Sequence, residues 1–226
     1  MAKCIILAGG GGHAAVIHDS AMLSKEEADI KVVWDTGAKV HPSLSQWVHV
    51  HSETDLAELL ESGGFSVALC YLCFGDPLLR KTKADALCKA TRKLSITVSY
   101  PNVVHPTAFL SSAAVIQQGN YFGPHSTTET GVVVGSFCII NAAAVVAHDS
   151  QLSDFVNVNP NASVCGNVKL MSGVTIGANA VIREKLCIAK NVTIGMGSVV
   201  TKDIVKGETM WYGVPAMLHD RKNEMP

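Results

Sequence analysis

The sequence predicts a fold in two parts: a small parallel α/β domain, followed by an all-β parallel β-helix of hexapeptide repeats. Three observations predict it. A strand, a glycine loop and a helix follow one another at the start of the chain. From Val104 to Val200 an apolar residue returns at every sixth position, and Pro101 and Pro106 mark the junction between the two patterns. A period of six fits neither an α-helix nor an isolated hairpin, but is typical of a β-helix with three short strands per coil.

The first part begins with an apolar run, Cys4–Ala8, followed by Gly9–Gly12 and by a helix that His13 opens. This order is that of the first half of a nucleotide-binding βαβ unit, in which glycines let backbone N–H groups approach a phosphate. A second strand, Ile30–Trp34, ends at Asp35, where a ribose-binding acid is expected. The glycines could equally form only a tight turn, and His13 could be a helix-start histidine without a ligand.

Further along, the pattern predicts a helix over 53–61, a strand over 67–74, a helix over 78–93 and a strand over 96–99. These elements give about four parallel strands, which is one Rossmann-like half domain. We therefore expect a nucleotide-type domain over 1–100 and a β-helix domain with a C-terminal tail over 101–226, with the boundary near Tyr100.

The β-helix pattern keeps its phase without an insertion. Of its seventeen positions all but Thr128 are apolar, and the fourth residue after each is usually small or β-branched. Three hexads make an 18-residue coil, so coils are expected to stack in register. The series is Val104, Leu110, Ile116, Phe122, Thr128, Val134, Ile140, Val146, Leu152, Val158, Val164, Leu170, Ile176, Ile182, Ile188, Ile194 and Val200.

Composition excludes some partners. Eighteen basic and nineteen acidic residues give a formal net charge of −1, which does not predict nucleic acid or an anionic membrane as a partner. No apolar stretch is long enough to span a membrane, and the N-terminal residues lack the apolar core of a signal peptide. The seven cysteines form no disulfide framework, so we expect reduced thiols and a cytoplasmic protein.

Several motifs together resemble one family of sugar acyltransferases. The chain is similar to the sialic-acid O-acetyltransferase/bacillosamine N-acetyltransferase group, the NeuD/PglD type. That resemblance implies a left-handed β-helix, and homotrimers with acetyl-CoA bound between neighbouring β-helices. The motifs are Gly11-Gly12-His13, the run from Ile140 through Asn141 to His148-Asp149, Cys165-Gly166-Asn167-Val168, Ile176-Gly177-Ala178 and Gly213-Val214-Pro215-Ala216.

The resemblance places the family's general base on His148 and its acidic partner on Asp149. Acyl transfer to an amine or hydroxyl needs a group that takes a proton near neutral pH, which a histidine oriented by a carboxylate does. A corner of the coil would let these two adjacent side chains face each other. The alternative is a surface His–Asp pair on a polar turn.

The resemblance also assigns binding residues. Family members often carry a second histidine nine residues after the base; here it is Asn157, whose amide could still donate to an oxyanion. Met217 replaces a basic residue near the CoA 3′-phosphate, for which Arg221 and Lys222 are candidate substitutes. The acetyl-CoA contacts fall on Asn157, Gly166, Ala178 and Met196. The acceptor contacts fall on Gly11, Gly12, His13, Asp35, Gly75, Asp76 and Asn141, of which Asn141 could also be only a repeat-corner residue.

The expected function is acetyl-CoA-dependent N-acetylation of a nucleotide-linked amino sugar, such as a UDP-linked 4-amino-dideoxy sugar, in surface glycan synthesis. The first alternative is O-acetylation of a free sugar such as sialic acid. A hexapeptide-repeat metalloenzyme would need His105, His125 and His148 to converge. The last two are 23 residues apart, which is not a multiple of 18, so no metal is expected. A non-catalytic scaffold is the remaining alternative.

Overall fold

The computed structural model describes residues 2–23, 28–35, 37 and 39–219. The chain divides into two compact units, Met1–Val103 and Val104–Pro226. The expected boundary near Tyr100 lies in the segment between the last strand of the α/β sheet and the first strand of the β-helix. Among the described residues, no helix is both long enough and apolar enough to cross a bilayer.

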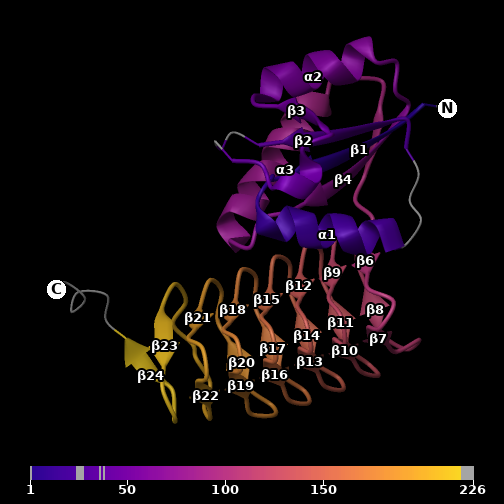
Figure 1. Ribbon diagram of the computed structural model, residues 1–226. Helices are drawn as coiled ribbons and strands as arrows, with labels where there is room; N and C mark the ends of the chain where they lie inside the picture. The colour runs from indigo at the N-terminus through magenta and orange to yellow at the C-terminus, as the bar shows by residue number, and fades with distance from the viewer. Residues whose placement is uncertain (1, 24–27, 36, 38, 220–226) are drawn as a thin grey trace. The chain divides into compact units, whose positions relative to one another are not determined.

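The first unit is a five-stranded parallel sheet with three α-helices (Figure 1). The strand order is β3-β2-β1-β4-β5. Its elements are β1 (Lys3–Ala8), α1 (Gly12–Leu23), β2 (Ile30–Trp34), the 3₁₀ turn η1 (Pro42–Leu44), β3 (Val48–Val50), α2 (Glu53–Ser62), β4 (Val67–Leu72), α3 (Pro77–Thr91) and β5 (Thr97–Ser99).

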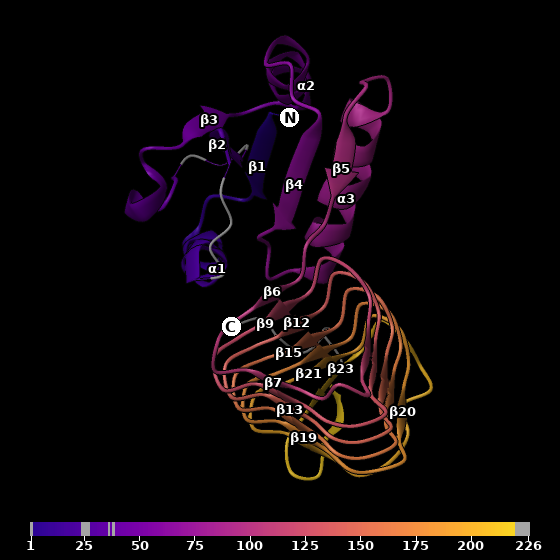
Figure 2. The same ribbon diagram turned by 90° about the vertical axis from the view of Figure 1, so that its right-hand side faces the viewer.

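This strand order creates a crevice between β1 and β4. The chain leaves β1 toward β2 and leaves β4 toward β5, which is the opposite direction, so the loops after these two strands diverge. Figure 2 shows α1 on one side of the sheet and α3 on the other. The loops that diverge carry the Gly9–Gly12 run and Gly75, and ligands of open α/β sheets bind at such points.

The expectation of about four strands was wrong by one. The sequence did not reveal β3, which has three residues and pairs with β2 at the edge of the sheet. Val48 and His49 are exposed in it, so it lacks the buried apolar alternation by which a strand is recognised.

The second unit is a three-sided β-helix in which each strand from β6 to β23 pairs in parallel with a strand one coil away. Sheet I contains β6 (Val103–Val104), β9 (Tyr121–Phe122), β12 (Ile139–Ile140), β15 (Asn157–Val158), β18 (Thr175–Ile176), β21 (Thr193–Ile194), β23 (Met210–Tyr212) and the antiparallel β24 (Met217–His219). Sheet II contains β7 (Phe109–Leu110), β10 (Thr127–Thr128), β13 (Val145–Val146), β16 (Ser163–Val164), β19 (Val181–Ile182) and β22 (Val199–Val200). Sheet III contains β8 (Val115–Ile116), β11 (Val133–Val134), β14 (Gln151–Leu152), β17 (Lys169–Leu170) and β20 (Cys187–Ile188).

The hexad residues form the core of this unit. From Phe122 to Val200 each is at most 2% exposed, including Thr128, because the second residue of each strand points into the coil. The first three members of the series lie in the first coil, which has another coil on one side only, and they are more exposed. Truncating such a buried Leu or Ile to Ala typically costs about 2–5 kcal/mol.

The corners of the coil need a left-handed backbone. Residues in this conformation recur in columns with an 18-residue spacing, one column for each corner. Most are Gly, Asn or Asp, which adopt positive φ with least strain. The columns contain Gly119, Phe137, Phe155, Gly173 and Asn191; His125, Ala143, Asn161, Asn179 and Gly197; and Gly131, Asp149, Asn167 and Lys185.

Candidate functional site

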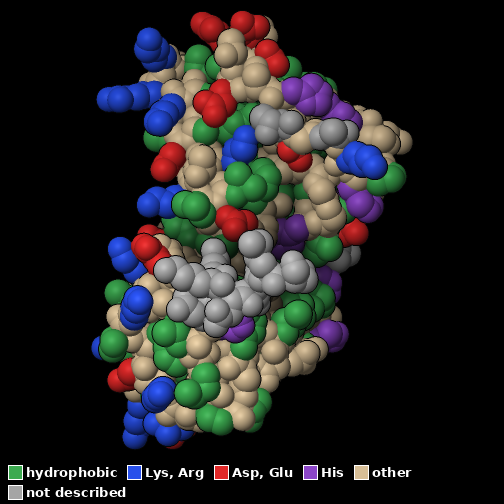
Figure 3. All heavy atoms as spheres, turned by 90° about the vertical axis from the view of Figure 1, so that its left-hand side faces the viewer, with side chains coloured by type: hydrophobic (Ala, Val, Ile, Leu, Met, Phe, Trp, Pro, Cys, Tyr) green, Lys and Arg blue, Asp and Glu red, His purple; other side chains and the backbone are tan. Residues whose placement is uncertain are grey.

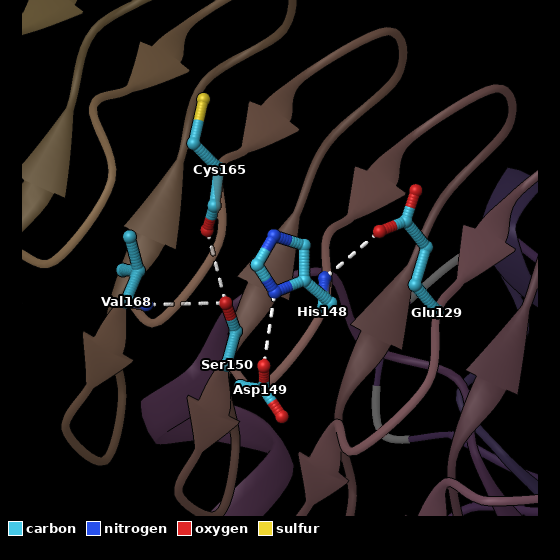
Figure 4. Close-up of polar contacts among 6 residues, drawn as sticks. All are labelled: Glu129, His148, Asp149, Ser150, Cys165 and Val168. Atoms are coloured by element: carbon cyan, nitrogen blue, oxygen red, sulfur yellow. Dashed lines mark hydrogen bonds and ion pairs between the residues drawn. The ribbon is translucent and has the colours of Figure 1, made fainter.

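His148 and Asp149 occupy the corner between β13 of sheet II and β14 of sheet III. Asp149 has φ +59°, and this left-handed residue turns the chain so that both side chains lie on the same side. Nδ1 of His148 is 2.9 Å from Oδ2 of Asp149 (Figure 4). An ionised carboxylate can only accept, so Nδ1 is the donor in this contact, and in the neutral imidazole Nε2 keeps its lone pair. Both side chains are more than half exposed. The arrangement is that of an oriented general base.

Two glycines leave room for this pair, one in each neighbouring coil. A Cβ at Gly131, 18 residues before Asp149, would collide with the Asp149 carboxylate. A Cβ at Gly166, 18 residues after His148, would lie 2.6 Å from Nε2 of the imidazole. The base therefore lies directly over backbone that has no side chain. Sequence reasoning included Gly166 but missed Gly131, although the 18-residue coil links it to Asp149.

Polar contacts hold the corner in place. Glu129, which follows β10, accepts the His148 backbone N–H at Oε2, with a distance of 2.9 Å. Ser150 is fully buried; its hydroxyl donates to the Cys165 carbonyl at 2.9 Å and accepts the Val168 N–H at 3.1 Å. Ser150 thus joins the His148 corner to the coil that carries Gly166. Sequence reasoning missed both Glu129 and Ser150.

The residues predicted to bind acetyl-CoA do not lie close together within one chain. Gly166 lies at the corner between sheets II and III, beside His148. Ala178 and Met196 lie at a different corner, between sheets I and II, where the Gly197 N–H donates to the Ala178 carbonyl. Met196 is 80% exposed. Asn157 is buried in β15, on the side of the triangle opposite the His148 corner.

The remaining CoA expectations concern the C-terminal end. Met217 opens β24 and is exposed. Arg221 and Lys222 lie outside the described residues, so the structure places no substitute for the missing basic residue. Gly213 to Ala216 connects β23 to β24 and contains a cis peptide before Pro215.

The glycine loop is open on one side and tightly packed on the other. Nothing lies within 4 Å of a Cβ built at Gly11 or Gly12, whereas one at Gly10 would lie 3.1 Å from Val33 and from Val40. Oδ2 of Asp35 accepts the Gly10 N–H at 2.6 Å, and its other oxygen accepts the Gly37 N–H at 2.8 Å. Asp35 therefore fixes the loop itself, a role that the sequence did not predict.

His13 is the second residue of α1. Burial, and secondarily the charge of Arg80, lower the pKa of His13 from 6.5 to about 4. At neutral pH the imidazole is therefore uncharged, so His13 can offer an anion a hydrogen bond but not a positive charge. The contact of His13 with an anionic substrate stays a prediction, in the form of a hydrogen bond from an uncharged ring.

The β4–α3 loop brings Gly75 and Asp76 to the other side of the crevice. Asp76 is the N-cap of α3, and Oδ1 accepts the Leu79 N–H at 2.7 Å. Gly75 is exposed, and a Cβ there would meet nothing within 4 Å. Arg80 is 1% exposed and donates from Nη1 to the Phe74 carbonyl at 2.7 Å. Asp76 and Arg80 thus hold the loop in place, and Gly75 remains exposed.

A pocket of about 650 Å³ lies over the glycine loop. Besides Gly11 and Gly12, its walls include three histidines and a lysine, which the sequence analysis did not single out. Figure 3 shows histidine side chains on this face of the α/β unit. These four residues fall within thirteen positions of the sequence, and this clustering could have identified them as candidate binding residues. They are Lys39, His41, His49 and His51. Cationic and hydrogen-bonding side chains around a glycine loop at the start of a helix suit a phosphorylated ligand.

Asn141 lies at the corner between β12 and β13, where its own Oδ1 accepts the Ala142 N–H at 2.8 Å. This contact gives Asn141 a structural role at the corner, and it does not involve the side-chain NH₂ group. His105 and His125 also lie at corners between sheets I and II, unlike His148. In the part of the chain that the structure describes, no three His, Cys, Asp or Glu side chains are grouped to hold a metal ion.

No protein-family model matches the chain, and no curated protein sequence matches it. Solved structures match nearly all of it. One is a histidine-to-asparagine variant of perosamine N-acetyltransferase from Caulobacter crescentus in complex with CoA and GDP-perosamine; identity is 26%, coverage is 97% of both chains, and the TM-score is 0.81. The structural homologues of this chain are hexapeptide-repeat sugar N-acetyltransferases.

Two further structures match nearly the whole chain. The acetyltransferase domain of PglB from Neisseria gonorrhoeae FA1090, in complex with acetyl coenzyme A, is 25% identical, with a TM-score of 0.80 and coverage of 96% of this chain and 98% of the domain. WeeI from Acinetobacter baumannii AYE shares the fold at 21% identity, with a TM-score of 0.82 and coverage of 96% and 100%. The predicted family resemblance and fold class, a Rossmann-like half domain and a left-handed β-helix, are confirmed.

Proposed function

We propose that this protein transfers the acetyl group of acetyl-CoA to the amine of a nucleotide-linked amino sugar. The observation that carries the proposal is the pair formed by His148 and Asp149, with Nε2 of the imidazole lying over Gly166. Its support is the structural match to enzymes solved with CoA, acetyl-CoA and GDP-perosamine at 25–26% identity.

In the reaction, the sugar ammonium loses one proton to solvent, and the amine nitrogen attacks the thioester carbonyl. The nitrogen becomes positively charged as its bond to carbon forms, and Nε2 of His148 takes a proton from it. Asp149 stabilises the imidazolium through Nδ1. The carbon–sulfur bond then breaks, and the imidazolium returns its proton to the CoA thiolate. The products are an amide, CoA thiol and one proton.

We propose that a second copy of the chain completes the site. Gly166 is beside His148, whereas Ala178, Met196 and Asn157 lie on other sides of the triangular coil. One chain therefore cannot bring all four residues to one acetyl-CoA. A neighbouring β-helix, in the homotrimer that the family resemblance implies, would supply the missing side of the thioester groove.

The acceptor's nucleotide is assigned to the first unit. The pocket is lined by Gly11 and Gly12, where a Cβ would meet nothing within 4 Å, with Lys39 and the histidines around it, and Gly75 lies across the crevice. These features favour a nucleoside diphosphate over a free sugar, because a free sugar presents no diphosphate to them.

A panel of substrates tests this proposal. GDP-perosamine and UDP-linked 3-amino and 4-amino sugars are incubated with acetyl-CoA, and thiol release and acetylated product are measured. We expect at least one nucleotide-linked amine to be acetylated. Acetylation of free sialic acid, with none of these nucleotide sugars used, would overturn the proposal and favour an O-acetyltransferase.

A further inference from the structure

Among the residues that the structure describes, Glu129 is the one carboxylate, besides Asp149, with a hydrogen bond to the residue that carries the base. Its backbone N–H donates to the Val146 carbonyl at 3.0 Å, so it lies alongside β13, the strand that leads to His148. Its side chain accepts the His148 N–H at 2.9 Å. In Figure 4 the Asp149 carboxylate lies below the imidazole and the Glu129 carboxylate lies to its right, next to the His148 backbone nitrogen.

Only part of the Glu129 carboxylate is used by these contacts. Oε2 takes the His148 N–H, while Oε1 has no hydrogen-bond or ion-pair partner among the residues that the structure describes. The side chain is half-buried, and the residue 18 positions further on, just after β13, is Ala147, whose side chain is a single methyl group. A half-buried carboxylate oxygen beside a general base is suited to a cationic or N–H donor of the substrate.

We propose that Glu129 is a specificity-determining residue that selects an ammonium, and so an amine, over a hydroxyl as the acetyl acceptor. The inference rests on the proposed function, whose base is His148. It adds a carboxylate that binds the acceptor group before reaction.

The count of protons on the acceptor atom supports this selection. An ammonium has three N–H protons: one is released to solvent, one passes through His148 to the CoA thiolate, and the third stays on the amide nitrogen. That third proton is available to Glu129 throughout the reaction. A hydroxyl has only one proton, which His148 must take.

A hydroxyl acceptor would therefore place oxygen lone pairs against the Glu129 carboxylate once its proton is engaged with His148. Selectivity then comes from repulsion as well as attraction. A site that leaves a polar group without its partner rejects the wrong substrate strongly. After transfer the amide is neutral, so the charge-assisted contact weakens, which favours product release.

The test uses Glu129→Gln, whose amide oxygen can still accept the His148 N–H while the charge is lost. Glu208→Gln is the matched control, because Glu208 is an exposed carboxylate whose partner is Lys190 at 4.0 Å. The probes are GDP-perosamine, its N-acetylated product, and the GDP-sugar with a hydroxyl in place of the amine. Equilibrium binding and steady-state rates are measured for the full-length protein.

We expect Glu129→Gln to weaken binding of GDP-perosamine about tenfold or more, as expected for a lost hydrogen bond to a charged group. Binding of the N-acetylated product and of the hydroxyl analogue is expected to be unchanged or tighter, and Glu208→Gln to have no effect. Equal loss for all three probes, or no loss for GDP-perosamine, would overturn the inference. If wild-type protein acetylates no nucleotide-linked amine, the proposed function itself fails, whatever the variant shows.

Discussion

Replacing Gly166 with alanine tests whether the open backbone beneath His148 serves catalysis. The new Cβ would lie 2.6 Å from Nε2, 2.7 Å from Cε1 and 3.2 Å from Cδ2 of the imidazole. Ordinary contacts begin near 3.5 Å, so the ring must move by about 1 Å. A misplacement of about 1 Å can cost about 10²-fold in rate, or roughly 2.7 kcal/mol of transition-state stabilisation.

The same change is expected to leave stability intact. Gly166 does not have a left-handed φ, so alanine fits its backbone, and the exposed imidazole can rotate away. Alanine at such a site typically stabilises by about 0.4–1 kcal/mol through the unfolded chain. We therefore expect kcat/KM to fall about 10²-fold, the melting temperature not to fall, and KM for acetyl-CoA to change little.

A double-mutant cycle with His148→Ala provides the control. If Gly166→Ala acts through the imidazole, it will have almost no further effect on kcat/KM once the imidazole is absent. Wild-type activity in Gly166→Ala, or an equal loss in the His148→Ala background, would refute the reasoning and point to a direct CoA contact instead.

Three further predictions concern the base, the loop and the core. Asp149→Asn keeps a residue that tolerates positive φ but removes the charge that orients Nδ1–H, so kcat is expected to fall about 10²–10⁴-fold; near wild-type kcat would contradict this role. Because the pKa of His13 is about 4 when folded and 6.5 when unfolded, the unfolded chain binds more protons between these values. The free energy of unfolding should fall as pH drops through this window, by about 3 kcal/mol in total, and urea titrations of His13→Gln should show a shallower fall. Ser150→Ala leaves the Val168 N–H and the Cys165 carbonyl without their partner, so urea unfolding should show a loss of about 1–3 kcal/mol; an unchanged midpoint would exclude the role of the hydroxyl.

The hexad pattern predicted the β-helix because the burial of one residue in six is enough to produce this pattern. One inward residue in six must be apolar whatever the neighbouring side chains do, so a single sequence displays the rule. Even Thr128, the exception, is buried with the rest. In contrast, β3 was missed because an edge strand of three residues with exposed side chains follows no such rule.

The site was only partly predictable. His148 and Asp149 are adjacent in sequence, so their pairing needed only a corner, and the left-handed φ of Asp149 supplies it. Gly131 and Glu129 act from the previous coil and were missed because their contacts follow the 18-residue stack rather than sequence proximity. The ligand contact predicted for Asp35 stays a prediction, but the sequence did not indicate that its carboxylate holds the glycine loop.

The central claim is that His148 removes the proton from an amine that attacks acetyl-CoA. The most direct measurement is single-turnover thiol release with GDP-perosamine or the best nucleotide-linked amine of the panel, for wild type and His148→Ala, with binding of both substrates measured in parallel. The account predicts that the variant binds both substrates normally but releases thiol about 10²–10⁴-fold more slowly. Thiol release at the wild-type rate in His148→Ala would contradict it.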